Sequence, residues 1–196
     1  ASSMSGNLGG YLHEYDEMNR PAYGKGNKPT PLASNLLGTP IIQEWGGQPC
    51  LGDATVDLCA AWAFEQFFRY DNMNFAKTLT DLGHPDHVYR DSEGAHAWRW
   101  WTPWLRDVHL PFLLARQAVA TDETPARWQY KSISEHFTIW GYEVSVERDV
   151  EELLELTDVT TSSMTLTGSG VVTVKTSAGG VHVVDLGDGS TQTIAT

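Results

Sequence analysis

The sequence is poor in cysteine and in long apolar runs, and each shortage excludes a class of protein. Its 196 residues include two cysteines, Cys50 and Cys59. They form no CxxC pair, so thiolates alone cannot build a zinc site. No apolar run approaches the roughly 20 residues of a membrane-spanning helix. We expect no metal and no cofactor. The two cysteines are either small buried residues or a local disulfide, which would suit an exported protein.

Basic side chains are also scarce. The chain has 13 Lys and Arg against 25 Asp and Glu, a formal net charge of −12. A field of this sign repels phosphate groups, and no basic stripe offsets it. Nucleic acid and anionic membranes are therefore excluded as partners. Hydrophobic residues make up 41% of the chain, which is enough for a packed core. The first residues, ASSMSGNLGG, are small and polar, unlike a signal peptide.

The pattern of apolar residues predicts two parts joined by a linker. Residues 1–116 are expected to form an α/β layer, in which strands at 39–47 and 87–91 alternate with helices at 54–68, 72–82 and from Thr102-Pro103 onward. Pro111 should bend the last helix. Residues 117–135 are polar and indicate a linker. Residues 136–196 alternate over short runs separated by Gly-rich turns, which predicts a small all-β module; within it, residues 149–156 have a helical pattern.

One histidine stands in a position suited to catalysis. His96 lies in the stretch GAHAW, directly after the predicted strand 87–91. Working residues of parallel sheets lie on loops beyond the carboxyl ends of the strands. Asp53 lies in the loop after the strand 39–47, at the same edge. A serine hydrolase needs such a histidine and an acid that orients it, so His96 and Asp53 are the candidate base and acid.

The run EGAHAWRWWTPWLRD, together with GGQPCLGD and NFAKTLTDLG, resembles the esterase and mycolyltransferase branch of the α/β-hydrolases, to which secreted actinobacterial esterases belong. Gly94, His96, Trp98 and Trp101 match its G-x-H-x-W-x-x-W motif. The resemblance covers residues 1–115 and implies the C-terminal portion of an α/β-hydrolase sheet with flanking helices. Trp98 and Trp101, which follow His96 closely, are the candidates for lining a substrate groove; the alternative is that these aromatic rings cover the seam between helix and sheet.

The acid and the nucleophile leave alternatives open. Glu44 and Asp57 remain candidates for the acid beside Asp53, because the spacing departs from the family pattern. Ser3 of ASSMSG could imitate a nucleophile elbow, but only two residues precede it. We favour the other interpretation, in which ASSMSGNL resembles the strand after the nucleophile helix. The nucleophilic serine then lies upstream or in a partner chain that completes the sheet.

The resulting hypothesis is a secreted or cell-envelope serine esterase or acyltransferase. It is a processed chain that acts on lipid or sugar esters and can form an oligomer. In this hypothesis His96 is the general base, and Asp53 is the acid that orients it. The competing hypothesis is a non-catalytic carbohydrate- or envelope-binding subunit on a degenerate hydrolase scaffold.

Overall fold

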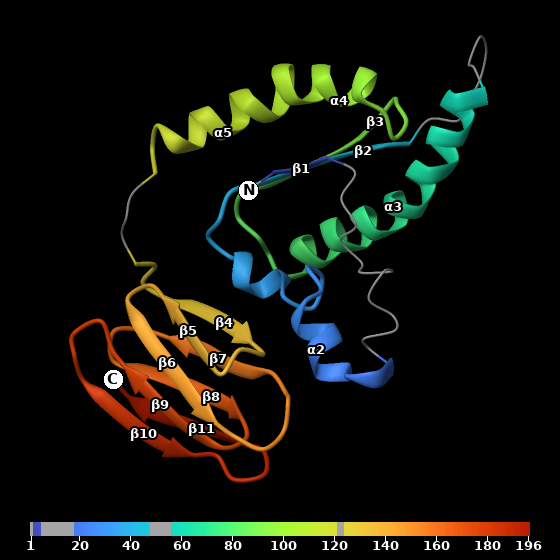
Figure 1. Ribbon diagram of the computed structural model, residues 1–196. Coiled ribbons are helices and arrows are strands. Elements are labelled where there is room, and N and C mark those ends of the chain that lie inside the picture. The colour runs from blue at the N-terminus through green and yellow to red at the C-terminus, as the bar shows by residue number, and fades with distance from the viewer. Residues whose placement is uncertain (1, 5–17, 48–55, 121–123) are drawn as a thin grey trace. The chain divides into compact units, whose positions relative to one another are not determined.

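The structure is a computed structural model that describes residues 2–4, 18–47, 56–120 and 124–196 (Figure 1). The chain divides into two compact units. The first unit comprises residues 1–11 and 38–122, and the second comprises residues 12–37 and 123–196. The sequence predicted a linker over residues 117–135, but the structure has a strand inside that range, at Trp128–Ser132.

A parallel sheet of three described strands forms the middle of the first unit, in the order β1–β2–β3. The strands are β1 (Ser2–Met4), β2 (Ile41–Gly46) and β3 (His87–Ser92). Every residue of β2 is buried, as expected for a central strand that is covered on both faces. The predicted strands at 39–47 and 87–91 are confirmed by β2 and β3.

Helices cover both faces of this sheet (Figure 1). They are α3 (Val56–Asp81) on one face and α4 (Trp98–Trp104), the π-helical turn η3 (Leu105–His109) and α5 (Leu110–Gln117) on the other. Two neighbouring residues of β2 show the alternation of a strand. Gln43 Nε2 donates to the main-chain oxygen of Asn72 on α3, at 3.4 Å, whereas Glu44 accepts from His109 on η3.

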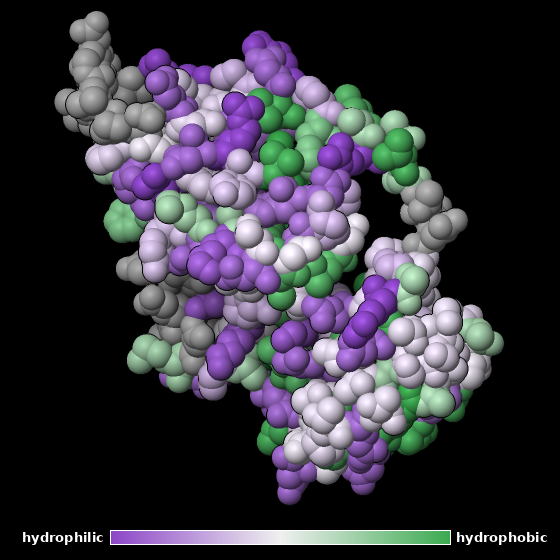
Figure 2. All heavy atoms as spheres, turned by 180° about the vertical axis from the view of Figure 1, so that it is seen from behind, coloured by the Kyte–Doolittle hydropathy of each residue, from purple (hydrophilic) through white to green (hydrophobic). Residues whose placement is uncertain are grey.

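The helix boundaries differ from the sequence prediction in two places. The two helices expected at 54–68 and 72–82 are one helix, α3, because residues 69–71 contain neither glycine nor proline to end it. The helix expected to begin at Thr102 begins at Trp98, so Pro103 lies inside it. Pro111 has no N–H to donate to the carbonyl oxygen of Asp107, and the π-helical turn η3 lies directly before α5. Helix α5 itself has no buried residue. Apolar residues at the surface over α5 are visible in Figure 2.

The second unit is a sandwich of two four-stranded antiparallel sheets, in the orders β10–β9–β6–β5 and β11–β8–β7–β4. The first sheet consists of β5 (His136–Ile139), β6 (Tyr142–Glu147), β9 (Val171–Lys175) and β10 (Val181–Asp185). The second consists of β4 (Trp128–Ser132), β7 (Leu154–Val159), β8 (Ser163–Gly168) and β11 (Ser190–Ala195). Alternate residues point between the sheets and form one core, which includes Val144, Leu156, Leu166 and Val172.

Two short helices belong to the second unit, α2 (Pro21–Gly26) and η2 (Ala33–Leu36). The Asn35 side chain on η2 exchanges two hydrogen bonds with the main chain of Lys131 on β4, each 2.8 Å long. The helical pattern at 149–156 was misleading, because Leu154 and Leu156 alternate into the core on strand β7, which Val159 ends with a further buried side chain.

The predicted fold class is wrong. In the described residues, 11 strands form three sheets, and two of these sheets belong to the sandwich rather than to a larger α/β-hydrolase sheet. The parallel sheet has three described strands. The β part is therefore not a small appended module. Its first strand begins at Trp128, residues 12–37 belong to the same unit, and its two sheets hold most of the described strands.

Candidate functional site

The loop after β3 lies close against the end of β2, and two glycines allow this approach. Gly94 has φ +146°, a conformation that residues with a side chain rarely adopt. A Cβ at Gly94 would lie 2.8 Å from Cζ2 of Trp104. A Cβ at Gly46 would lie 2.3 Å from the carbonyl oxygen of Gly94. The glycine of the G-x-H motif is therefore required by backbone conformation and by packing.

His96 is attached to helix α3 at two points. Its main-chain N–H donates to the carbonyl oxygen of Ala61, at 3.1 Å. Its side-chain Nδ1 lies 3.0 Å from Oε2 of Glu65. Ala61 and Glu65 are four residues apart and so share one face of the helix. Helix α3 therefore fixes both the backbone and the ring of His96.

Glu65 is itself held in place. Its side chain has no exposed surface, and its second oxygen, Oε1, accepts a hydrogen bond from the main-chain N–H of Gly46, at 2.8 Å. Because a carboxylate only accepts hydrogen bonds, Nδ1 of His96 must be the donor. The proton of the neutral ring is then on Nδ1, which leaves Nε2 with a lone pair. This is the tautomer that a general base needs.

Aromatic rings surround the His96 imidazole on several sides. Phe64, Phe68 and Trp101 have ring centroids 4.9, 5.2 and 4.5 Å from it. The His96 side chain nevertheless keeps 25% of its surface exposed. Trp98 packs edge-on against Trp101, with centroids 5.3 Å apart, and is itself 69% exposed. A histidine that is oriented by an acid therefore opens to solvent beside exposed aromatic surface.

The structure brings some of the predicted site residues together and places others elsewhere. The structure brings His96, Trp98 and Trp101 together, and the acid beside them is Glu65, which the sequence analysis did not consider. Asp53 lies outside the described residues, as does Cys50, and the side chain of Asp57 is likewise not described. Glu44 is on the opposite face of the sheet and does not contact His96. Among the described residues, Glu65 is the one side-chain hydrogen-bond partner of His96, so the nucleophile remains a prediction.

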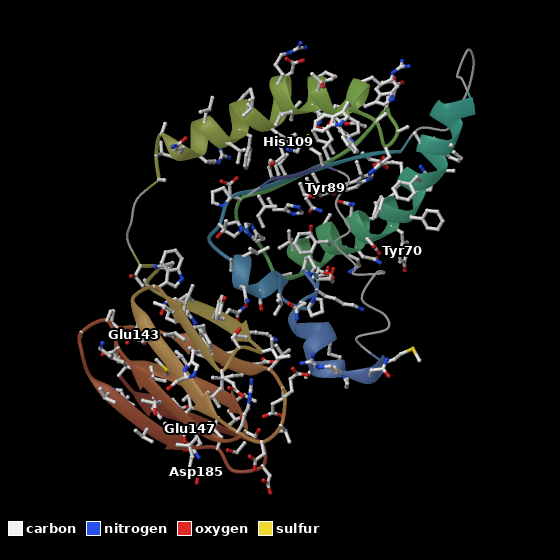
Figure 3. The ribbon with its side chains drawn as sticks, in the orientation of Figure 1. Tyr70, Tyr89, His109, Glu143, Glu147 and Asp185 are labelled. Carbon is white, nitrogen blue, oxygen red and sulfur yellow. The ribbon has the colours of Figure 1, made fainter. Side chains whose placement is uncertain are left out.

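A second buried network lies on the other face of the sheet. Glu44 has no exposed surface and accepts hydrogen bonds from Ser92 Oγ at 2.5 Å and from Nε2 of His109 at 3.2 Å. Arg90 Nε lies 3.5 Å from the same carboxylate. Burial alone would raise the pKa of Glu44, but the hydrogen bonds from His109 and Ser92 and the charge of Arg90 together lower the pKa below its ordinary value. Figure 3 shows His109 on the α5 side of the sheet.

The sequence around each of the two buried glutamates indicates that its carboxylate is buried and paired. Glu65 is the acid within CAAWAFEQFF and Glu44 the acid within PIIQEWGG. A carboxylate in an apolar segment is rarely buried unless it is paired. Each acid therefore indicated an internal partner, although a single sequence does not say which one.

The described residues contain no group of three or more His, Cys, Asp or Glu that could hold a metal ion. Within the same residues, no helix is both long and apolar enough to cross a membrane. No protein-family model and no curated protein matches the chain. The resemblance to the esterase and mycolyltransferase branch therefore stays a prediction.

Proposed function

We propose that this chain supplies the general base, His96, and its orienting acid, Glu65, to a serine-dependent esterase or acyltransferase. The observation that supports this is the chain of hydrogen bonds from Gly46 N–H through Glu65 to Nδ1 of His96. It leaves Nε2 with a lone pair on a ring that is one-quarter exposed. The nucleophilic serine belongs to an upstream segment or to a partner chain.

The reaction that suits this pair begins with a proton transfer. Nε2 of His96 takes the proton of the serine hydroxyl as the serine oxygen attacks the ester carbonyl. The carboxylate of Glu65 stabilises the imidazolium that forms. The imidazolium then gives its proton to the leaving alcohol, and an acyl-enzyme remains. Water or a sugar hydroxyl then loses its proton to His96 as it attacks the acyl carbon, and the imidazolium gives this proton to the serine oxygen when the acyl–serine bond breaks.

The surface beside His96 favours a substrate with an apolar group next to the ester. Phe64 and Trp98 are 51% and 69% exposed, and Phe67 on the same helix is 67% exposed. Aromatic surface of this kind binds apolar chains by burial and by ring contacts. We therefore include lipid or cell-envelope esters as the substrate class, and with them a secreted or envelope location.

Fluorophosphonate labelling of the complete native protein, together with any chain that co-purifies, tests this proposal. The probe reacts with a serine only when a base activates it. We expect one labelled serine, and we expect His96→Ala to lower labelling and p-nitrophenyl ester turnover about 10⁴- to 10⁶-fold. His136→Ala, at an exposed histidine of β5, is the control. Retained turnover in His96→Ala would remove the proposal.

A groove in the second unit supports the competing function, a non-catalytic envelope- or carbohydrate-binding subunit. It encloses about 650 Å³ across β5, β6, β9 and β10, and its polar lining includes His136, Glu143 and Lys175. Figure 3 labels Glu143 on this sheet. If no serine is labelled in any chain of the native preparation, the binding function is favoured over the enzyme.

A further inference from the structure

Strand β3 is an edge of the parallel sheet in the described residues, and one row of its backbone groups points away from the sheet. The sheet order ends at β3. Ile41 N–H donates to the carbonyl oxygen of Asp86, at 2.9 Å, and Gly47 N–H donates to that of Ser92, at 2.8 Å. Since a parallel ladder engages every second residue, the even-numbered residues of β3 bond to β2. His87, Tyr89 and Asp91 therefore direct their N–H and C=O groups outward.

This edge has few of the features that deter strand pairing. It is six residues long and regular, with no proline. Its charged side chains are engaged within their own chain, because Arg90 lies 3.5 Å from Glu44 and Arg69 bonds to Asp91 at 2.6 Å. Val88 and Tyr89 leave apolar surface exposed. An edge of this kind favours addition of another strand.

The three outward-facing residues are arranged symmetrically about Tyr89. An antiparallel partner must present its own outward-facing residues opposite them. A second copy of β3 does so when a two-fold axis passes beside Tyr89. Tyr89 then faces Tyr89 of the second copy, and His87 faces Asp91 at both ends of the pair, so that no two like charges lie opposite one another. The next positions pair Val88 with Arg90.

The aromatic packing of Tyr89 leaves room for this pairing. Its ring is stacked on the buried Trp45, with centroids 6.0 Å apart and planes 7° apart, and Figure 3 shows it on the sheet. This contact holds the Tyr89 side chain along the α3 face of the sheet, so it does not block the outward backbone groups. Two such rings meeting at the axis would cover apolar surface that is now 55% exposed.

We propose that two copies of this chain associate through antiparallel pairing of β3 with β3, centred on Tyr89, to form one continuous sheet. Such an interface is isologous, the commonest kind in homodimers. The proposal does not depend on the proposed catalytic function, since none of the paired residues contacts His96 or Glu65.

Sedimentation equilibrium of the full chain, with Tyr89→Pro as the variant, tests the association. Proline at position 89 removes an outward N–H and leaves the bonds from β3 to β2 in place. We expect a dimer for the native chain, and a dissociation constant at least about 100-fold higher for Tyr89→Pro. Tyr89→Thr, which keeps the N–H, should remain a dimer. The native chain should be tested at about 100 µM, because this is about ten times a dissociation constant of about 10 µM and most chains would then be paired. A chain that is monomeric at this concentration overturns the proposal.

Cysteine cross-linking tests the register without relying on the proline variant. In a chain carrying Cys50→Ser and Cys59→Ser, Tyr89→Cys places two thiols at a facing pair, with Cα atoms about 5.5 Å apart. It should form a covalent dimer on mild oxidation. Val88→Cys should not, because two copies of residue 88 would be about 8 Å apart, beyond disulfide reach. Equal cross-linking by both variants, or none by Tyr89→Cys, contradicts this register.

Discussion

The main-chain N–H of Gly46 and the carboxylate of Glu65 are joined by a 2.8 Å hydrogen bond. It connects the end of strand β2 to helix α3, and the other oxygen of the same carboxylate orients His96, at 3.0 Å. The acid of the candidate site is therefore set by two elements that are distant from the His96 loop in sequence. The position of the imidazole depends on the packing of α3 against the sheet.

Glu65→Gln should disturb the tautomer of His96 while leaving the fold intact. The amide has nearly the same shape, but its NH₂ group can donate to Nδ1 where the carboxylate only accepted. We expect the native Nδ1–H tautomer to lose its preference in ¹⁵N NMR spectra of the imidazole. Ester turnover should fall about 10³- to 10⁴-fold. Glu143→Gln, at an exposed ion pair with Lys175, is the matched control. An unchanged tautomer in Glu65→Gln would contradict the orienting role.

Glu44 should make the first unit sensitive to acid. Hydrogen bonds to its charged form keep the pKa of Glu44 low in the folded chain, so the unfolded chain binds its proton more readily. The stabilisation is complete above about pH 4.3, the ordinary value for glutamate, and is lost as the pH falls through the lower folded value. Glu44→Ala at neutral pH leaves His109 and Ser92 without their acceptor and should cost about 3–5 kcal/mol.

Hydrogen exchange of the peptides that contain β2 and β3, measured between pH 7 and pH 3, checks this prediction. The difference in protection between the native chain and Glu44→Ala should shrink as the pH falls below about 4.3. Asp81→Asn provides the control, because Asp81 pairs with Lys77 at the surface and should change stability by less than about 0.5 kcal/mol. A difference that stays constant with pH would show that the charge of Glu44 contributes nothing.

Gly94→Ala should destabilise the His96 loop more than the same change at another glycine with positive φ. At Gly94 the new methyl group meets Trp104 at 2.8 Å and Trp100 at 3.0 Å, in addition to the strain of φ +146°. At Gly83, with φ +68°, no atom lies within 4 Å, so strain alone applies, about 1 kcal/mol. We expect an unfolding free energy about 1–3 kcal/mol lower for Gly94→Ala than for Gly83→Ala. Equal effects would mean that packing around Gly94 is loose.

The parts of the fold that the sequence predicted well have strong local signals. The strand at 39–47 has apolar residues followed by two glycines, and the strand at 87–91 lies between Gly83 and Gly94. The β-sandwich was underestimated because its first strand, β4, lies in a polar stretch. That strand is half-buried, paired with β7, and so lacks the apolar run expected of a core strand. The run at 149–156 has a helical pattern, although β7 begins within it at Leu154.

The sequence predicted the histidine of the candidate site but not its acid, and the difference has a physical reason. His96 follows a strand directly, so its place at the edge of the sheet could be read from the sequence. Glu65 approaches it from the middle of a long helix, and the contact depends on how α3 packs, which no local pattern encodes. The predicted fold class places the acid in the loop after a strand, where Asp53 lies, and therefore points away from a helix.

The core of the second unit should unfold without affecting the first, because each unit has its own buried core. Leu166 on β8 has no exposed surface and belongs to the cluster between the two sheets. Leu166→Ala should lower the unfolding free energy of this unit by about 2–5 kcal/mol through lost burial and the cavity that remains. Thr165→Ala is the control on the neighbouring residue, whose hydroxyl bonds to Thr193 at the surface. Hydrogen exchange should rise in β7 and β8 of Leu166→Ala and stay native in β2 and β3; an equal rise in both units would show that they unfold as one.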